Sequence, residues 1–167
     1  MAKKIGYKTY WFSNQGRYGQ FDSAITMVAK TADVAEWTDD SYNFTTKYDE
    51  SLLPYLTRID PKANNFVVLH LMGSHIYYNN RYPDTWAKFD SAAGDSTATS
   101  APSYANSILY TDHILAEIFA SAEKNLNLRA MVYFSDHGEN LQISHNPDVF
   151  KFDMVRIPLF IYLSPEY

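Results

Sequence analysis

The stretch Ala-Met-Val-Tyr-Phe-Ser-Asp-His-Gly-Glu, residues 130–139, decides how the rest of the chain is interpreted. Its first half, Met131 to Phe134, is apolar or aromatic, as in a buried strand. The run stops abruptly at five residues, Ser-Asp-His-Gly-Glu, in which Gly138 permits a tight turn. Strand ends in open α/β sheets bind ligands, and an aspartate oxygen beside a histidine nitrogen suits a divalent metal such as Zn²⁺. The same residues also fit a polar turn between a strand and a helix, with Asp136 as the N-cap.

A second strand pattern lies upstream and favours the metal interpretation. Residues Phe66 to Met72 are again largely apolar, and His75 follows them closely. A third histidine, His145, lies eight residues past His137 in a turn-rich segment. Because the C-terminal ends of parallel strands meet at one edge of a sheet, these three histidines are expected to converge there. His70, inside the strand itself, is expected to be a buried core residue.

Hydrophobic periodicity predicts the remaining elements. Strands are expected over residues 5–13, 32–37 and near Leu159, and helices over residues 22–30, 48–59 (beginning near Ser51) and 102–125. The residues expected to face inward are, in the first helix, Phe21, Ile25, Val28 and Ala29, and in the longest, Ile108, Thr111, Leu115, Ile118, Phe119 and Ala122. His113 and Glu117 are expected to form a pair on the solvent side of the longest helix, with Asp112 near its buried edge.

Length and composition indicate one folded domain and exclude several classes of site. The chain has 167 residues, of which 46% are hydrophobic and 16% aromatic, as in a globular protein with a real core. A net charge of −5 gives no electrostatic footprint for nucleic acid, so none is expected as a partner. The absence of cysteine excludes thiol nucleophiles, thiolate zinc sites and disulfides. No apolar run approaches the ~18 residues of a membrane span, and the first residues do not resemble a signal peptide.

Four motifs occur in a recognisable order. They are TYWFSNQGRYGQFD at Thr9–Asp22, VLHLMGSHIYYNNRYP at Val68–Pro83, YANSILYTDHILAEIF at Tyr104–Phe119 and YFSDHGENL at Tyr133–Leu141. Together they resemble the catalytic domain of bacterial phosphoethanolamine transferases of the lipid A and core-oligosaccharide-modifying type. Those enzymes belong to the alkaline phosphatase and sulfatase superfamily. The resemblance covers almost the whole chain, and with the pattern of elements it predicts a three-layer α/β/α sandwich with a mostly parallel central sheet.

The resemblance also implies how the chain is placed in a longer protein. Residues 1–167 are expected to be the C-terminal part of an N-terminally truncated catalytic domain, with one sheet edge left exposed. Full-length members have an N-terminal membrane domain, which would place the parent protein in the bacterial inner membrane with this domain facing the periplasm. The fragment itself is expected to be soluble.

The resemblance further implies a zinc site, with one or two ions. In the family, zinc is held by the Asp and His of Ser-Asp-His-Gly-Glu, a Glu and a nucleophilic Thr. Asp136 and His137 match the first two, whereas the Glu and the Thr are expected upstream of Met1, outside this chain. His75 and His145 are expected to contact the substrate phosphate or a second metal.

Three more residues are expected around this site without binding the metal. Glu139 belongs to the same motif as His137. Asn14 and Gln15 match a Trp-x-x-Asn-Gln motif that the family places at a strand end close to the active site.

The implied reaction is a ping-pong transfer of phosphoethanolamine from phosphatidylethanolamine to lipid A or a core sugar. The partners would be a phospholipid donor and a glycolipid acceptor, and the fragment without its Thr is expected to be inactive. Two alternatives stay open. One is a sulfatase or phosphodiesterase of the same superfamily, and the other is a non-catalytic fragment.

Overall fold

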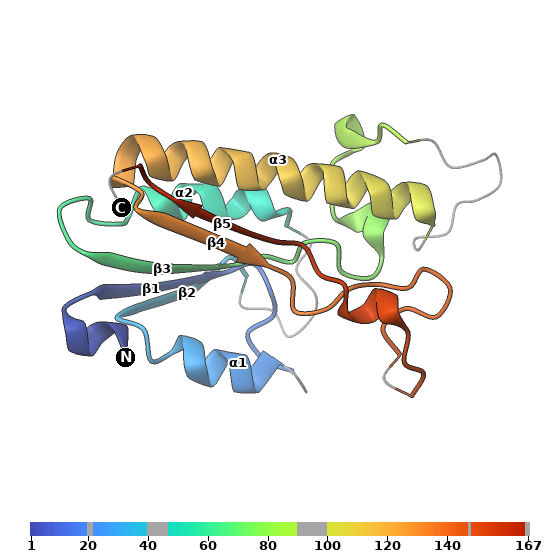
Figure 1. Ribbon diagram of the computed structural model, residues 1–167, viewed down its shortest axis with the longest axis horizontal. Coiled ribbons are helices and arrows are strands. Elements are labelled where there is room, and N and C mark those ends of the chain that lie inside the picture. Colours follow the sequence, from blue (N-terminus) through green and yellow to red (C-terminus); the bar gives the residue numbers. More distant parts are fainter. Residues whose placement is uncertain (20–21, 40–46, 90–99, 147, 166–167) are drawn as a thin grey trace.

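Helices lie on both sides of the strands (Figure 1). This computed structural model describes residues 1–19, 22–39, 47–89, 100–146 and 148–165. Helix α1 (Asp22–Ala29) covers one side of the strands. The short α2 (Leu53–Leu56) and the long α3 (Ala101–Leu126) cover the other side. The predicted three-layer α/β/α arrangement is confirmed.

Three strands form a parallel sheet in the order β2-β1-β3. They are β1 (Lys8–Ser13), β2 (Val34–Trp37) and β3 (Asn65–His70), and β1 pairs with both neighbours in parallel. In this register Ser13 is opposite His70, so the polar ends of β1 and β3 lie together. The mostly parallel sheet expected from the sequence is therefore present.

The last two strands, β4 (Ala130–Phe134) and β5 (Leu159–Leu163), pair antiparallel with each other. They form a separate ladder, so within the described residues β3 and β4 each have a single neighbour. A parallel return needs a crossover, usually a helix. The described part of residues 135–158 contains only a 3₁₀ turn, Phe152–Val155, and the chain returns antiparallel.

The predicted elements form, but several of their ends differ. The first strand begins at Lys8 because Ala2–Ile5 form a 3₁₀ turn that ends at Gly6 with φ 89°. The helix expected over 48–59 is a 3₁₀ turn, Asp49–Leu52, followed by the single turn of α2. Pro54 lies in the first turn of α2, the position that tolerates a missing N–H. Two further 3₁₀ turns, Tyr78–Asn80 and Asp84–Trp86, lie between β3 and α3.

The core lies between the parallel sheet and the helices α2 and α3. Tyr10 and Phe12 of β1 point into it, whereas Trp11, one residue between them, faces the other side of the sheet and packs against His70. The remaining buried members are Leu52, Leu56, Ile59, Tyr82, Tyr110, Ile114 and Ile118.

Four of the six residues predicted to face inward on α3 are buried, but the first half of the helix differs from the prediction. Ile108 is 45% exposed and Asp112 is exposed, while Asn106 and Tyr110 are buried. Asn106 turns inward because its Oδ1 accepts hydrogen bonds from the main-chain N–H groups of Lys88 and Phe89. The other buried residues of this helix are Ser107, Thr111, Ile114, Leu115, Ile118 and Ala122.

Two more expectations about helix faces are wrong. His113 is only partly exposed, because its ring stacks on Trp86 with centroids 4.4 Å apart. In α1, Ile25 and Val28 are exposed, and Thr26 is buried instead because its hydroxyl donates to the Arg17 carbonyl. Phe21, also expected inward, lies outside the described residues.

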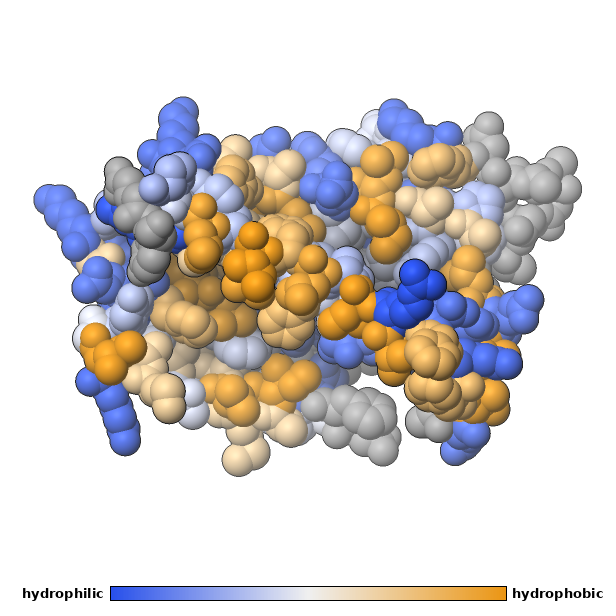
Figure 2. All heavy atoms as spheres, viewed as in Figure 1, coloured by the Kyte–Doolittle hydropathy of each residue, from blue (hydrophilic) through white to orange (hydrophobic). Residues whose placement is uncertain are grey.

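One face of β4 and β5 is an exposed apolar surface. Val132, Phe134, Ile161 and Leu163 each expose more than half of their area. Figure 2 shows apolar residues gathered across the middle of the view, where β4 and β5 lie in Figure 1. Contiguous apolar surface of this kind is unusual on a monomeric protein and marks a contact surface.

We expect Phe12→Ala to lower the free energy of unfolding by about 3–5 kcal/mol, because it empties a core position that is 0% exposed. Phe66→Ala is the matched control, since Phe66 lies on the neighbouring strand and is 51% exposed. Urea unfolding followed by circular dichroism measures both. Equal losses in the two variants would contradict the placement of the core.

Candidate active site

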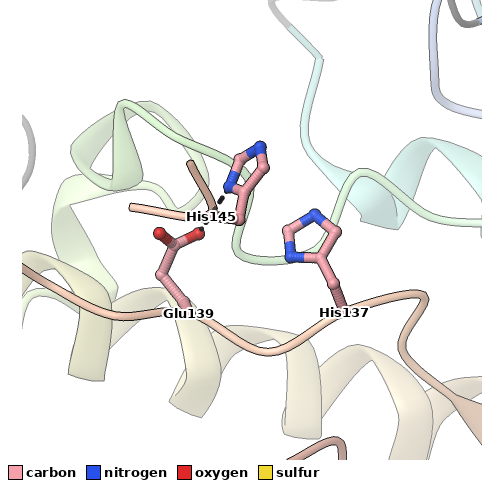
Figure 3. Close-up of side chains that lie close together, drawn as sticks. All are labelled: His137, Glu139 and His145. Carbon is pink, nitrogen blue, oxygen red and sulfur yellow. Dashed lines mark hydrogen bonds and ion pairs between the residues drawn. The ribbon is translucent and has the colours of Figure 1, made fainter. Parts of the chain in front are cut away.

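The candidate site lies where β3 and β4 end (Figures 1 and 3). The chain leaves β3 toward His75 and leaves β4 through Ser135-Asp136-His137, and both strands run toward the same side of the molecule. The pKa of His70, the last residue of β3, is influenced by the charge of Asp136, so the two strand ends are close in space.

Of the three histidines singled out in the sequence, His137 and His145 come together, and His75 is near enough for their charges to act on it. The rings of His137 and His145 lie 4.2 Å apart between centroids. The pKa of His75 is lowered from its usual value, first by burial, then by the positive charge of Arg81, and further by His145 and His137. His75 is therefore mainly neutral at pH 7, and it shares the site with the other two.

Glu139 completes a cluster with His137 and His145 (Figure 3). Each of the three offers a ligand atom, and these atoms all lie within 4.8 Å of one another. The Glu139 carboxylate is 5% exposed, and its Oε2 lies 3.2 Å from Nδ1 of His145. Its Oε1 accepts no hydrogen bond from any described residue. A buried carboxylate oxygen without a partner is costly, so the arrangement favours a bound cation or donor at this point.

Asp136 and His137 form another possible set of zinc ligands. Nδ1 of His137 lies 2.7 Å from the Gly138 carbonyl, which can only accept, so Nδ1 carries the proton and Nε2 keeps a lone pair. That Nε2 is 3.9 Å from Oδ1 of Asp136, near the ~3.4 Å between ligand atoms of a tetrahedral zinc with 2.0–2.2 Å bonds. Imidazole and carboxylate ligands fit zinc in both sets, and His137 is common to them.

Gly138 is required by the close approach of another segment. Its N–H donates to the Met154 carbonyl, and a Cβ at this position would lie 2.0 Å from the Asp153 carbonyl oxygen. The segment after His145 is thereby fixed against the motif. A cavity of about 420 Å³ opens between them, lined by Tyr104, Glu139, Asp153, Arg156, Ile157 and Pro158.

Two tyrosines that the sequence analysis did not single out adjoin this cluster. The rings of Tyr78 and Tyr104 lie 4.9 Å apart. The pKa of each phenol is raised, first by burial and then by the negative charge of Glu139. Both therefore keep their protons and can act as hydrogen-bond donors. Tyr78 and Tyr104 fall inside the quoted motifs, but nothing in their spacing points to Glu139.

Asn14 and Gln15 lie at the end of β1, beside the chain that leads to His75. Asn14 is fully buried and donates to Oδ1 of Asp49, and Gln15 donates to the Leu71 carbonyl. These contacts join both residues to the scaffold of the site. Asp49 belongs to none of the sequence motifs, so its place beside Asn14 appears only in the structure.

The structure also tests two predictions from the sequence, that His70 is a core residue and that Asp136 could be a helix N-cap. His70 is half-buried, with Nδ1 3.0 Å from Ser13 Oγ and its ring against Trp11, so it is a satisfied structural residue. The N-cap alternative for Asp136 is wrong, because residues 135–146 contain no helix.

Comparison with known proteins gives a consistent family. A model of the sulfatase family matches residues 1–167. The phosphoethanolamine transferase EptC of Escherichia coli K12 is 28% identical and matches 100% of this chain and 32% of its own length. The phosphoethanolamine transferase OpgE of the same organism is 34% identical over 83% of this chain and 26% of its own length. The chain thus spans about a quarter to a third of the length of these relatives.

Solved structures agree with the fold. The C-terminal periplasmic domain of EcEptC from Escherichia coli, in complex with Zn, superposes with a TM-score of 0.82 at 28% identity. The match covers 98% of this chain and 51% of that one. The soluble domain of lipooligosaccharide phosphoethanolamine transferase A from Neisseria meningitidis has a TM-score of 0.74 at 22% identity, which shows the fold alone. Among the described residues, no helix is both long and apolar enough to cross a bilayer.

The burial of His70 predicts how stability changes with pH. Burial lowers its pKa in the folded chain below the value near 6.5 that it has when unfolded. As pH falls through 6.5 the unfolded chain takes up the proton first, so the free energy of unfolding should fall until the pH reaches the folded pKa.

The test compares urea unfolding of the wild type and His70→Gln between pH 7.5 and 5. His70→Gln should lose less stability over this range than the wild type, whatever its stability at pH 7.5. Identical pH slopes would contradict the shifted pKa of His70.

Proposed function

The chain belongs to the sulfatase family, and we propose on that premise that it is part of the catalytic domain of a zinc-dependent phosphoethanolamine transferase. The observation that carries the proposal is the convergence of His75, His137, Glu139 and His145 in a chain whose relatives are named phosphoethanolamine transferases. The transferase names favour group transfer over sulfate-ester or phosphodiester hydrolysis.

Residues 1–167 would form the C-terminal part of that domain. The match to about half of the solved EcEptC domain supports this, as does the exposed apolar face of β4 and β5, which further structure would cover. The nucleophilic Thr and a Glu ligand would then come from residues outside this chain. Membrane attachment through an N-terminal domain, in a bacterial inner membrane with this domain in the periplasm, is part of the same proposal.

Asp136 and His137 would hold the zinc together with the outside residues. A zinc bound there supplies neutralising charge for the phosphoryl oxygens and lowers the pKa of a bound hydroxyl. His137 is suited to this because its Nδ1 is engaged with the Gly138 carbonyl, which fixes the tautomer and leaves Nε2 as the ligand atom. Glu139 and His145 offer two further ligand atoms for a second zinc beside it.

The remaining side chains would bind the transferred group. Neutral His75 can donate one N–H to a phosphoryl oxygen, and the protonated phenols of Tyr78 and Tyr104 are further donors near Glu139. His145 is oriented by its contact with Glu139. The donor would be phosphatidylethanolamine and the acceptor lipid A or a core sugar, with the phosphoethanolamine carried in between on the Thr.

In the membrane protein to which we propose this chain belongs, Asp136→Ala and His137→Ala should each lower transfer by at least about 100-fold, since each removes charge stabilisation needed in the transition state. Glu117→Gln, on the exposed side of α3, is the control and should transfer at the wild-type rate. The assay is mass spectrometry of the acceptor after incubation with labelled phosphatidylethanolamine. Wild-type-like transfer by Asp136→Ala would refute the metal role of that residue.

Zinc binding by the 167-residue chain separates the two ligand sets. The set of three, His137, Glu139 and His145, should dominate in this chain, because the pair Asp136 and His137 supplies fewer protein ligands. Glu139→Gln should therefore weaken zinc binding by about tenfold or more, while Asp136→Asn changes it little. Isothermal titration with Zn²⁺ at pH 7.5 measures both, and the reverse order would assign the zinc to Asp136.

A further inference from the structure

A buried carboxylate that belongs to none of the motifs lies beneath the loop of His75. Asp49 is only 5% exposed and sits between the ends of β1 and β3. We propose that Asp49 is a positioning residue: it fixes the main chain that leads from β3 to His75, and so sets where the His75 imidazole stands in the site.

The carboxylate holds two successive peptide N–H groups at the end of β3. Oδ1 accepts from the N–H of Met72 at 2.9 Å, and Oδ2 accepts from the N–H of Gly73 at 2.8 Å. Hydrogen bonds to an ionised acceptor are about twice as strong as neutral ones. Gly73 has φ 58°, a left-handed conformation that glycine adopts readily, and the chain turns there toward His75 two residues later. Asp49 thus fixes the direction in which the chain leaves the strand.

Asn14 connects this carboxylate to the other strands. Its Nδ2 donates to Oδ1 of Asp49 at 2.8 Å, its Oδ1 accepts from the Thr38 hydroxyl at 2.5 Å, and its own N–H donates to the His70 carbonyl. Thr38 directly follows β2, so one network joins the ends of all three parallel strands. The Asn of Trp-x-x-Asn-Gln therefore acts on the His75 loop through Asp49.

Arg81 holds the other side of the same loop. Its buried guanidinium donates from Nε to the His75 carbonyl and from Nη2 to the Ile76 carbonyl. Burial raises the pKa of Asp49, while its three N–H donors and the positive charge of Arg81 act in the opposite direction. Three donors aimed at one carboxylate favour its ionised form. Opposite charges thus fix the loop on both sides of His75.

The consequence for the site is geometric. Glu139 and His145 come from the β4 side, whereas His75 is brought in by a separate loop. A displacement of about 1 Å in a positioned group can cost about 100-fold in rate. The inference rests on the proposed function only in giving His75 a role at a phosphoryl group, since the position of His75 can be measured without it.

The test uses the five histidines of the 167-residue chain. Asp49→Asn keeps the size of the side chain but replaces one carboxylate oxygen by an NH₂ group. That NH₂ cannot accept a hydrogen bond, so at least one of the three N–H donors loses its acceptor. In ¹H–¹³C spectra of the histidine rings, the His75 Cε1–H signal should shift. Its signal in the wild type is identified by its loss in His75→Gln.

Asp33→Asn is the matched control. Asp33 likewise accepts from a main-chain N–H and a hydroxyl, both of Thr9, but it lies at the opposite end of β1 from Asn14. Asp33→Asn should leave the His75 signal in place even where it lowers stability. Asn14→Ala, which removes one of the three donors to Asp49, should shift the His75 signal in the same direction by less. If Asp49→Asn does not fold, Asn14→Ala tests the inference in its place.

Transfer kinetics in the membrane protein supply the second readout. Asp49→Asn should lower kcat by about tenfold and leave KM within about twofold of the wild-type value. The reason is that Asp49 positions His75 and does not itself bind the substrate. An unmoved His75 in folded Asp49→Asn, or an equal shift in Asp33→Asn, would overturn the inference. A moved His75 with unchanged kcat would support the positioning role and refute the role of His75 in the proposed function.

Discussion

The structure depends on one buried carboxylate that satisfies the main chain where the parallel strands end. A strand that leaves a sheet exposes peptide N–H groups, and buried donors of this kind must find acceptors. Asp49 accepts from Met72, Gly73 and Asn14 at once. The Asp49 carboxylate therefore satisfies the main-chain donors at the strand ends and also fixes the path of the loop that leads to His75. This single side chain thereby contributes to both stability and site geometry.

Two glycines allow the loops to follow the paths that these contacts require. Gly73 adopts a positive φ where the chain turns off β3. Gly138 has an ordinary φ, but it touches the carbonyl oxygens of Asp153 and Arg156 so closely that any Cβ would collide. One glycine is needed for its backbone conformation and the other for its lack of volume. Together they let segments far apart in sequence surround Glu139 and His145.

The helices cover the sheet unevenly. α2 and α3 bury the face that carries Tyr10 and Phe12, whereas β4 and β5 leave Val132, Phe134 and Ile161 exposed. Because β3 and β4 belong to separate ladders, the site is assembled from two halves joined by packing rather than by shared strand hydrogen bonds. The position of His75 relative to His145 and Glu139 therefore depends on how firmly each loop is held by its own half.

The sequence by itself determined the strands, the long helix and the three histidines, because apolar runs and the polar residues that end them are local signals. It also determined the family, through motifs such as Ser135-Asp136-His137-Gly138-Glu139. Only the tertiary structure decided that Ile108 faces outward and Asn106 inward, since that depends on the N–H groups of a distant loop. Only it showed Asp49, which lies in no motif, and placed Glu139 against His145. Hydrogen bonds between residues far apart in sequence leave no periodic pattern along the chain, so they become visible only once the chain is folded.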